Sequence, residues 1–397
     1  MPDLIRVSLH SPGQAGAFMR ELGVSGAGCR LMAGKCAVEP VLVRNVTCAE
    51  ANILKQAMLS LGGDAAIHRE VITGRVERSD ALLLGTRRQL RKLAAGLAAQ
   101  SFSLPARGRD LERLLGDPPA AFHYAGGSLA LDRLRVMGVL NVTPDSFSDG
   151  GRFLDPAAAL GQAGALRAAG ADIIDIGGES TRPGADPVAE DEELRRVMPV
   201  LEALKDRPGC PVSIDTRRPA VARRALAAGA AIVNDIGGCG DPALVAAVAA
   251  AGAGVIIMHM QGEPRTMQAA PRYDRVVDDI LAFLEERAAA AMRGGVAAAA
   301  IMVDPGIGFG KTAADNLAIL RRIADLRGLG FPVLVGASRK SFIGRTLGLP
   351  AERRLPADIA VTAWCAQQGV AAVRVHDVGE AVIARDMVRA IARGMEG

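Results

Sequence analysis

Polar residues able to hold a flat heterocycle occur at three points in the sequence. Asp215, Asn234 and Asp304 each end a short apolar run, so each is expected at the end of a buried strand. Carboxylate and amide groups can pair with the donors and acceptors on the edge of such a ring. Buried groups of this kind discriminate strongly, because a wrong ligand leaves them unpaired. The three residues therefore predict a site for a polar ring.

A second group of residues predicts phosphate binding. Residues 336–344, Gly-Ala-Ser-Arg-Lys-Ser-Phe-Ile-Gly, combine hydroxyls, glycines and two cations where a helix is expected to begin, which favours an anion. Arg374 and His376 share one face of an expected strand, because side chains alternate along a strand. Arg182 lies among glycines, and guanidinium groups bind phosphate oxygens in a bidentate manner.

The segment 141–151 offers oxygen ligands. It consists of Asn-Val-Thr-Pro-Asp-Ser-Phe-Ser-Asp-Gly-Gly. A hard cation such as Mg²⁺ prefers oxygen and often binds through substrate phosphates, so the segment can supply one amide oxygen while water and phosphate supply the rest. A capped turn without metal is the alternative, since Asp and Ser form such turns by themselves.

No covalent nucleophile is indicated. The sequence lacks Gly-x-Ser-x-Gly and His-Glu-x-x-His. Residues 304–312 end in Gly-Lys-Thr, but the glycine spacing and Pro305 do not fit a P-loop. The pattern favours chemistry at a substrate phosphate, with metal and cations stabilising a departing anion.

Alternating elements must position these residues. Apolar runs typical of strands occupy residues 136–140, 172–176, 211–215, 231–235, 254–259, 300–304, 331–336 and 371–376. Between them, helical periodicity covers residues 156–169, 190–205, 219–228, 242–251, 273–293, 315–326, 355–368 and 379–393. Eight such units predict a (β/α)₈ TIM barrel, with the site at the carboxyl ends of the strands. A doubly wound open sheet is the competing fold.

Residues 1–128 follow a different pattern and are expected to form a small α/β domain. Helices are predicted near 48–60 and 88–98, a strand at 81–84 and a connector near 103–128. This extension contains no recognisable catalytic motif, so the catalytic domain is expected at residues 129–397.

Composition limits the function classes. The 397 residues are 50% hydrophobic and 23% charged, which is typical of a globular protein rather than a disordered one. The net charge is +4, and the basic excess lies in residues 1–128, where Arg87, Arg88, Arg91 and Lys92 cluster. A solvated helix face explains this cluster better than nucleic-acid binding, because no binding motif accompanies it.

The sequence also favours a cytoplasmic location. The six cysteines lack the spacing of a zinc site, which favours free thiols in a reducing compartment. The first residues do not resemble a signal peptide. The longest uncharged stretch, residues 242–258, is shorter than the ~20 residues of a membrane span.

Five motifs together resemble dihydropteroate synthase. They lie at residues 141–151, 179–184, 304–311, 338–341 and 374–378, in the order of that family, and the resemblance covers the chain from about Leu134 onward. The resemblance implies that 6-hydroxymethyl-7,8-dihydropterin diphosphate and 4-aminobenzoate give 7,8-dihydropteroate and diphosphate, with Mg²⁺. It implies that diphosphate leaves first and that the arylamine attacks a pterin methylene cation. It further implies a homodimer and competition by sulfonamides.

Roles for individual residues follow from the same resemblance. Asn141 would be the Mg²⁺ ligand, and the catalytic groups would be Asp215, Asp304, Lys340 and Arg374. The pterin would be held by Asp215, Asn234, Asp304 and Lys340, the diphosphate by Thr181, Arg374 and His376, and 4-aminobenzoate by Phe147, Arg182, Pro183, Phe309 and Ser341.

The sequence departs from the family at two points and leaves two other functions open. The N-terminal domain is extra, and Glu263 replaces a residue that is often neutral. A pterin-barrel methyltransferase, which passes methyl from a reduced folate to a corrinoid, would not need residues 180–184 or 338–341. An inactive barrel kept as a partner protein would be expected to lack Lys340, Asp215 or Arg374, and all three are present.

Overall fold

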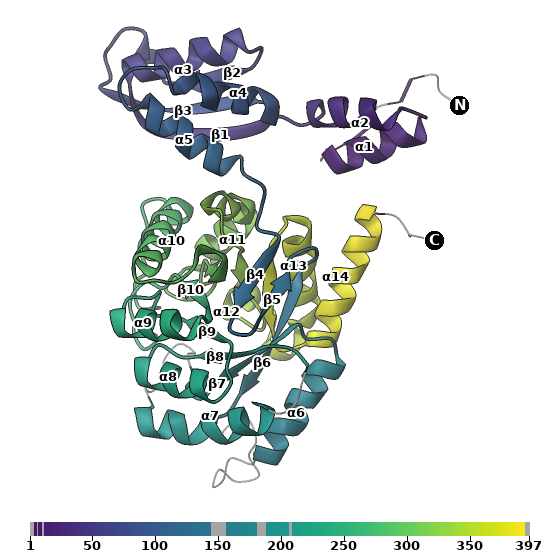
Figure 1. Cartoon of the computed structure of the whole chain (residues 1–397), viewed down its shortest axis with the longest axis vertical. Helices are drawn as coiled ribbons and strands as arrows, with labels where there is room; N and C mark the ends of the chain where they lie inside the picture. The colour runs from purple at the N-terminus through teal and green to yellow at the C-terminus, as the bar shows by residue number, and fades with distance from the viewer. Residues whose placement is uncertain are drawn as a thin grey trace. The chain divides into compact units, whose positions relative to one another are not determined.

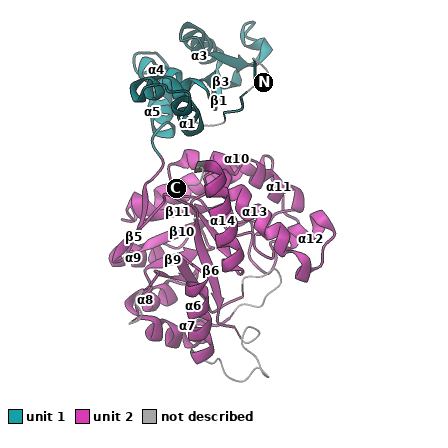
Figure 2. Cartoon of the chain, turned by 90° about the vertical axis from the view of Figure 1, so that its right-hand side faces the viewer, with its two compact units in different colours: residues 1–117 teal, residues 118–397 magenta. Residues whose placement is uncertain are grey.

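The chain divides into two compact units between Asp117 and Pro118 (Figure 2). The computed structural model describes residues 4–5, 7–9, 12–143, 156–180, 188–205 and 209–393. No helix among these residues is long and apolar enough to cross a membrane.

The first unit contains a three-stranded antiparallel sheet. Its strands β1 (Glu39–Thr47), β2 (Asp64–Ile67) and β3 (Arg78–Gly85) lie in the order β1-β3-β2. The helices are α1 (Pro12–Glu21), α2 (Gly26–Met32), α3 (Cys48–Ser60), α4 (Arg87–Leu97) and α5 (Leu104–Leu114), with short 3₁₀ turns η1 (Ala33–Lys35) and η2 (Arg69–Val71). Apolar residues of the strands and of α3, α4 and α5 share one core, so the predicted small α/β domain is confirmed.

Sequence signals fix where two of these helices begin. Thr47 starts α3 in a capping box with Glu50, and Thr86 starts α4 in a capping box with Gln89. Arg87 and Arg91 of the basic cluster both donate to the carbonyl of Leu115, just past the end of α5. Cations stabilise a helix C-terminus, so these two arginines contribute to the packing of α4 on α5.

The second unit is a closed parallel barrel. Its strands are β6 (Arg135–Asn141), β7 (Ile173–Gly177), β8 (Val212–Asp215), β9 (Ile232–Asp235), β10 (Gly254–Met258), β11 (Ile301–Asp304), β12 (Leu334–Val335) and β13 (Ala372–Val375). They pair in the order β11-β10-β9-β8-β7-β6-β13-β12, and Figure 1 shows several of them together in the second unit. A parallel bridge between Val303 and Val333 closes the ring. The prediction of a (β/α)₈ barrel is confirmed, and the open doubly wound sheet is excluded.

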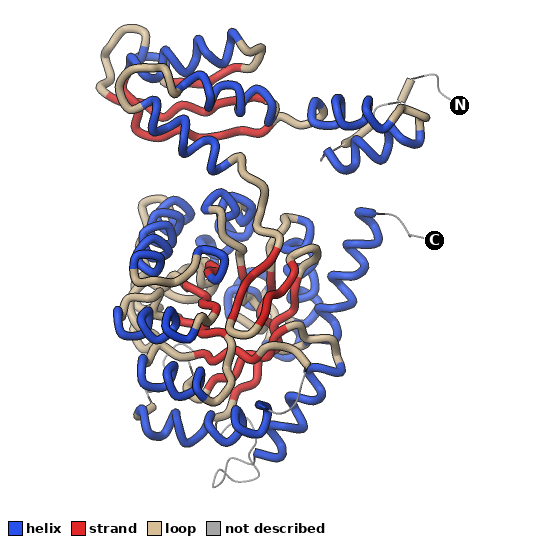
Figure 3. The backbone as a smooth tube through the Cα atoms, in the orientation of Figure 1, coloured by secondary structure: helices blue, strands red, loops and turns tan. Residues whose placement is uncertain are grey.

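Helices surround the barrel (Figure 3). They are α6 (Pro156–Ala168), α7 (Glu190–Lys205), α8 (Pro219–Ala227), α9 (Pro242–Ala251), α10 (Val276–Arg293), α11 (Ala313–Arg321), α12 (Ser341–Leu347), α13 (Leu355–Gln367) and α14 (Val378–Arg393), with 3₁₀ turns η3 (Ala298–Ala300), η4 (Ile323–Leu329) and η5 (Ala351–Arg353). The predicted helix 315–326 is divided into α11 and η4. The predicted strand 331–336 is reduced to β12, where Pro332 cannot donate a ladder hydrogen bond.

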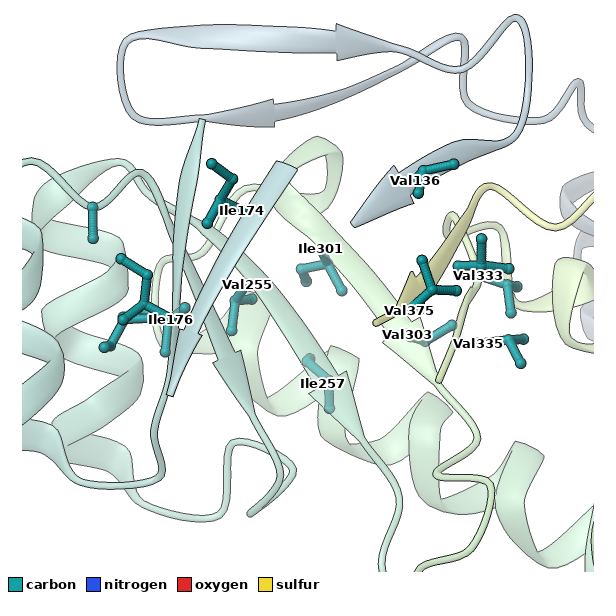
Figure 4. Close-up of a cluster of buried hydrophobic side chains, with 14 of the residues drawn as sticks. Val136, Ile174, Ile176, Val255, Ile257, Ile301, Val303, Val333, Val335 and Val375 are labelled. Atoms are coloured by element: carbon teal, nitrogen blue, oxygen red, sulfur yellow. The ribbon is translucent and has the colours of Figure 1, made fainter. Parts of the chain in front are cut away.

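Side chains alternate between the two faces of each barrel strand. One set points to the helices and forms the main core, including Val136, Ile174, Val255, Val303 and Val375 (Figure 4). The opposite set faces the barrel interior, and its members near the strand starts form a separate apolar cluster, which contains Met137, Ile173, Ile232, Ile256, Met302, Leu334 and Ala372. Because the period is two, the interior face continues from these residues to the polar residues at the strand ends.

The boundary between the units differs from the expected one near residue 128. The expected connector 103–128 contains α5 of the first unit and a hairpin of the second, formed by β4 (Ala121–Tyr124) and β5 (Gly127–Ala130). Phe122 of this hairpin is fully buried in the apolar cluster at the strand starts. A side chain at Gly254 would clash with its ring. The hairpin thus covers the amino end of the barrel instead of serving as a linker.

Candidate active site

The interior face of the barrel places acidic, amide and basic groups at the carboxyl ends of the strands. Asp175 lies two residues beyond Ile173, Asn234 two beyond Ile232, Asp304 two beyond Met302 and Arg374 two beyond Ala372. Asp215 ends β8. Because the strand period is two, the residues that face the barrel interior are apolar near the strand starts and polar at the strand ends, here called the barrel mouth.

Arg374 connects two carboxylates across this mouth. Its Nε donates to Oδ2 of Asp175 at 2.6 Å, and a terminal nitrogen donates to Oδ2 of Asp215 at 2.8 Å. Asn234 donates through Nδ2 to the same Asp175 oxygen at 3.1 Å. These charge-assisted bonds fix the orientation of all four side chains, so the mouth is organised before any ligand binds.

Burial shifts the charge states of the mouth. Burial raises the pKa of Asp215 to about 7, against the opposing effect of Arg374 and with a further rise from Asp175. Burial also raises the pKa of Asp304, while Lys340 and the hydrogen bond from the Gly306 amide oppose the shift. Both carboxyl groups are therefore less readily ionised than in water.

Lys340 reaches the mouth from the loop after β12. Its Nζ donates to the carbonyl of Ile307 and lies 4.5 Å from the centroid of the Phe309 ring. Burial lowers its pKa to about 8, although Asp304 favours the charged form. The ammonium group of Lys340 thus lies over the aromatic face of Phe309 and interacts electrostatically with Asp304.

The loop after β11 is held by a second, deeply buried lysine. Lys311 is 1% exposed, and its Nζ contacts Nδ1 of His259 at 2.9 Å and donates to the carbonyl of Phe309 at 2.9 Å. Burial lowers the pKa of Lys311 to about 7 and that of His259 to about 3. Lys311 thus secures the loop from beneath, which agrees with the expectation that residues 304–312 are not a P-loop.

His376 and Ser338 form a polar corner beside β13. Nδ1 of His376 lies 3.2 Å from Oγ of Ser338. Arg339 is exposed and pairs with Asp377, and Ser341 is also exposed at the start of α12. The expected phosphate corner thus contains Arg374, His376 and Lys340, with Ser341 open to solvent.

Asn141 ends β6 close to this mouth. Its Oδ1 would lie 3.6 Å from a side chain at Gly177, whose other neighbour is Asp215. Among the described residues, no group of three or more His, Cys, Asp or Glu side chains is arranged to hold a metal. Four predicted site residues, Phe147, Thr181, Arg182 and Pro183, lie outside the described residues.

Asp175 is the main site residue that the sequence analysis did not select. It is fully buried and bonds to both Arg374 and Asn234. It lies inside the predicted strand 172–176 rather than at the end, where site residues of a barrel are expected. A charged residue inside an otherwise apolar strand was the available signal.

The fold is a (β/α)₈ barrel whose mouth brings carboxylate, amide and basic groups together at the carboxyl ends of the strands. The family model described as "Pterin binding enzyme" matches residues 137–376, and the chain belongs to this family. Dihydropteroate synthase of Escherichia coli (strain K12) is 45% identical over 265 residues, which cover 67% of this chain and 94% of the relative. The chain thus belongs with the dihydropteroate synthases, which are transferases of folate biosynthesis.

Solved structures agree with this placement. Dihydropteroate synthase of Yersinia pestis in complex with a sulfonamide drug is 44% identical, with a TM-score of 0.65 over 68% of this chain and 98% of that one. The Xanthomonas albilineans enzyme with 4-aminobenzoic acid is 45% identical, with a TM-score of 0.65 over 69% and 98%. These likenesses confirm the resemblance seen in the five motifs.

A longer relative matches residues of this chain outside the barrel as well. A probable bifunctional folylpolyglutamate synthase/dihydropteroate synthase of Haloferax volcanii is 42% identical over 352 residues, 84% of this chain. The match is longer than the second unit, so it includes part of the first unit. This chain spans only 41% of that relative's length.

Proposed function

We propose that this enzyme condenses 6-hydroxymethyl-7,8-dihydropterin diphosphate with 4-aminobenzoate to form 7,8-dihydropteroate and diphosphate. The observation that supports this reaction most directly is the linked set of Asp175, Asp215, Asn234 and Arg374 in the barrel mouth. The Xanthomonas albilineans enzyme has also been solved with 7,8-dihydropteroate, at 43% identity to this chain.

The pterin ring is proposed to bind through its edge. Its ring nitrogens and exocyclic amine carry donors for the carboxylates of Asp215 and Asp304, and its acceptors suit the amide of Asn234 and the ammonium of Lys340. Each of these groups is held by the barrel before binding, which reduces the cost of ordering them.

The bond-breaking step produces a positive pterin methylene and a negative diphosphate, and the barrel mouth contains groups of opposite charge for each. The bond from the pterin methylene carbon to oxygen breaks, and its electron pair leaves with diphosphate. Asp215 and Asp304 offset the positive charge on the methylene, while Arg374, Lys340 and His376 offset the negative charge on diphosphate. The amine of 4-aminobenzoate then forms the carbon–nitrogen bond and releases a proton.

A magnesium ion fits this site only if substrate phosphate oxygens supply some of its ligands. Asn141 offers one amide oxygen near Asp215, and the described residues contain no acidic cage. Mg²⁺ commonly keeps several waters and binds through substrate phosphates, which suits a single protein ligand. The ion would neutralise charge on the departing diphosphate. We expect EDTA to abolish turnover while leaving the fold unchanged.

The 4-aminobenzoate ring is proposed to lie beside Phe309 and Ser341, together with Phe147, Arg182 and Pro183. Phe309 already packs its ring against the Lys340 ammonium. Thr181 is proposed to contact the diphosphate. A sulfonamide occupies the Yersinia pestis relative, and we expect sulfonamides to compete with 4-aminobenzoate here.

Helix α14 supports the proposal of a homodimer. Ile383, Met387 and Ile391 are 70%, 59% and 73% exposed, and their spacing of four places them on one helix face. An apolar stripe of this kind is typical of an interface between subunits. Light scattering should show a dimer that Met387→Glu converts to monomer, whereas a monomeric wild-type protein would contradict the proposal.

A cytoplasmic location is proposed from the cysteines. All six are free thiols, which suits a reducing compartment.

The reaction is tested with the purified full chain, both substrates and Mg²⁺, with the products identified by mass spectrometry. We expect 7,8-dihydropteroate, and we expect none when either substrate is omitted. Folded protein that binds the pterin substrate but forms no product would contradict the proposal and favour an inactive barrel.

A further inference from the structure

Arg339 has an unusual backbone conformation at the edge of the site. Its φ is +60°, in the left-handed region that residues with a side chain rarely adopt. Its amide donates to Oδ2 of Asp358 at 2.9 Å, and its carbonyl accepts from Arg354 at 3.3 Å. Its guanidinium pairs with Asp377. Several contacts thus maintain a conformation that costs energy, which is a pattern found at functional sites.

Asp358 also connects to the expected diphosphate contact His376. Asp358 lies in the first turn of α13 and is 7% exposed. Its Oδ2 accepts a hydrogen bond from the Ser338 hydroxyl at 3.4 Å. The same Oγ lies 3.2 Å from Nδ1 of His376 and accepts from the His376 amide at 3.4 Å. A carboxylate, a hydroxyl and an imidazole are therefore linked in series.

The direction of these bonds follows from the carboxylate. An ionised Asp358 only accepts, so the hydroxyl proton of Ser338 points to it. Oγ of Ser338 then offers its lone pairs to His376, which favours a proton on Nδ1. With Nδ1 fixed as a donor, a second proton on His376 goes to Nε2, which then becomes the other donor of the ring. The resulting imidazolium is the form that binds an anion.

Asp358 is not explained by stability alone. Its Oδ1 is buried and has no hydrogen-bond partner among the residues that the structure describes. It lines a small cavity of about 10 Å³, measured as the space open to the centre of a water molecule, which is roughly the size needed for one water. Burial raises the pKa of Asp358, although the Arg339 amide opposes the shift. An apolar side chain would avoid the cost of burying this carboxyl group.

We infer that Asp358 is a positioning residue for the diphosphate: through Ser338 it orients His376, and through the Arg339 amide it holds the turn that contains Ser338. The inference rests on the proposed function. The carboxylate of Asp358 accepts from the Ser338 hydroxyl and the Arg339 amide, so we expect its loss to weaken binding of the anion more than binding of the pterin ring.

The test compares three variants of the full chain. Asp358→Ala removes the acceptor, and Asp358→Asn keeps the shape but loses the charge. Thr362→Val is the matched control, because Thr362 lines the same cavity and its hydroxyl donates to the Asp358 carbonyl of its own helix. Calorimetry measures the affinity for inorganic diphosphate and, separately, for 6-hydroxymethylpterin without phosphate.

We expect both Asp358 variants to bind diphosphate about tenfold more weakly, the size of one hydrogen bond to a charged group. The KM of these variants for the pterin diphosphate should rise by a similar factor, while their affinity for the unphosphorylated pterin should change by less than about twofold. Thr362→Val should bind both ligands within about twofold of the wild type. If Asp358→Ala does not fold, the shape-preserving Asp358→Asn decides the question.

Two results would overturn the inference. One is unchanged diphosphate affinity in a folded Asp358 variant. The other is an equal loss of affinity for diphosphate and for the unphosphorylated pterin, which would indicate a merely structural role. Wild-type protein that neither binds diphosphate nor turns over would instead contradict the proposed function.

Discussion

At the scale of the residue, the barrel mouth is an arrangement of charges with altered proton affinities. Burial raises the pKa of Asp215 to about 7 and lowers that of Lys340 to about 8. Both shifts arise because a buried site disfavours the charged form of either group. The charge of the mouth therefore changes near neutral pH, where isolated carboxyl and ammonium groups would not titrate.

Lys340→Ala should reduce kcat at least about a hundredfold, because in the proposed reaction it removes a preorganised cation that offsets the charge of the departing diphosphate. The melting temperature should change little, since burying an ammonium group costs free energy that alanine does not incur. Lys92→Ala, at an exposed position in α4, is the control for loss of a lysine. Wild-type turnover in Lys340→Ala would show that the site assignment is wrong.

The pH dependence of activity should report Asp215. If the ionised carboxylate stabilises the methylene cation, kcat/KM should fall about tenfold per pH unit below the pKa near 7. Asp215→Asn should be slow at every pH and should lose this limb of the profile. A wild-type profile that is flat between pH 5 and pH 8 would contradict the role of Asp215.

The same carboxyl group should affect stability in a defined direction. Its pKa is higher in the folded state than the ordinary value of 3.8, so the folded protein holds this proton more tightly. The contribution of Asp215 to the free energy of unfolding is therefore full below about pH 4 and is lost as the pH rises through about 7. Urea unfolding at several pH values should show that the wild type loses more stability over this range than Asp215→Asn.

The residue scale also shows the limit of prediction from sequence. Asp215, Asn234 and Asp304 were predictable because each ends an apolar run, and Arg374 because it shares one face of an expected strand with His376. Asp175 was not selected, because its partner Arg374 is remote in the sequence and only the closed barrel brings them together. The Asp358–Ser338–His376 series depends on contacts between α13 and two loops, and no local pattern indicates it.

At the scale of the element, the loop after β11 is shaped by contacts from below. Gly306 has φ +67°, and a side chain there would lie 1.9 Å from the carbonyl of His259. Lys311 ties the far end of the same loop to His259 and Phe309. The loop conformation thus requires both a glycine and a buried lysine, and it positions the Ile307 carbonyl that accepts from Lys340.

Gly306→Ala should destabilise the protein much more than Gly330→Ala. Both glycines have positive φ, but nothing lies within 4 Å of a side chain added at Gly330. Gly330→Ala should therefore cost only the backbone strain of about 1–2 kcal/mol, whereas Gly306→Ala adds a steric clash with backbone. Urea unfolding measures both, and equal losses would contradict the described packing of the loop on His259.

Most barrel elements were predictable, since strand and helix periodicities alternate regularly from residue 136 onward. The exceptions have physical reasons. β12 is only two residues long beside Pro332, and its place in the ring is secured by pairing with β13 and by the bridge from Val333 to Val303. The hairpin β4–β5 resembles a linker in sequence, because it follows Pro118 and Pro119 and turns at Gly126 and Gly127, and its partner, the barrel floor, is distant in sequence.

At the scale of the whole molecule, the two units have separate cores, and the residues of the barrel mouth lie in the second unit. The first unit adds a sheet and helices, and part of it is included in the match to the longer relative from Haloferax volcanii. Its contribution to catalysis is testable by truncation, since the boundary at Asp117 leaves the hairpin on the barrel.

A protein that begins at Pro118 should fold and retain kcat, because the barrel and its covering hairpin are intact. A protein that begins at Leu129 should be unstable or insoluble, because it loses Phe122 and exposes the apolar cluster at the strand starts. Circular dichroism and turnover measure both forms. Equal behaviour of the two truncations would show that the hairpin is only a connector.

The central claim is that the barrel mouth separates a pterin methylene from diphosphate and joins it to an arylamine. The most direct measurement is the release of diphosphate from the purified full chain, followed together with 7,8-dihydropteroate formation. We predict equal amounts of the two products, with release that requires Mg²⁺ and 4-aminobenzoate and is lost in Lys340→Ala. Folded protein that releases no diphosphate from the pterin substrate, or releases it without forming dihydropteroate, would contradict this account.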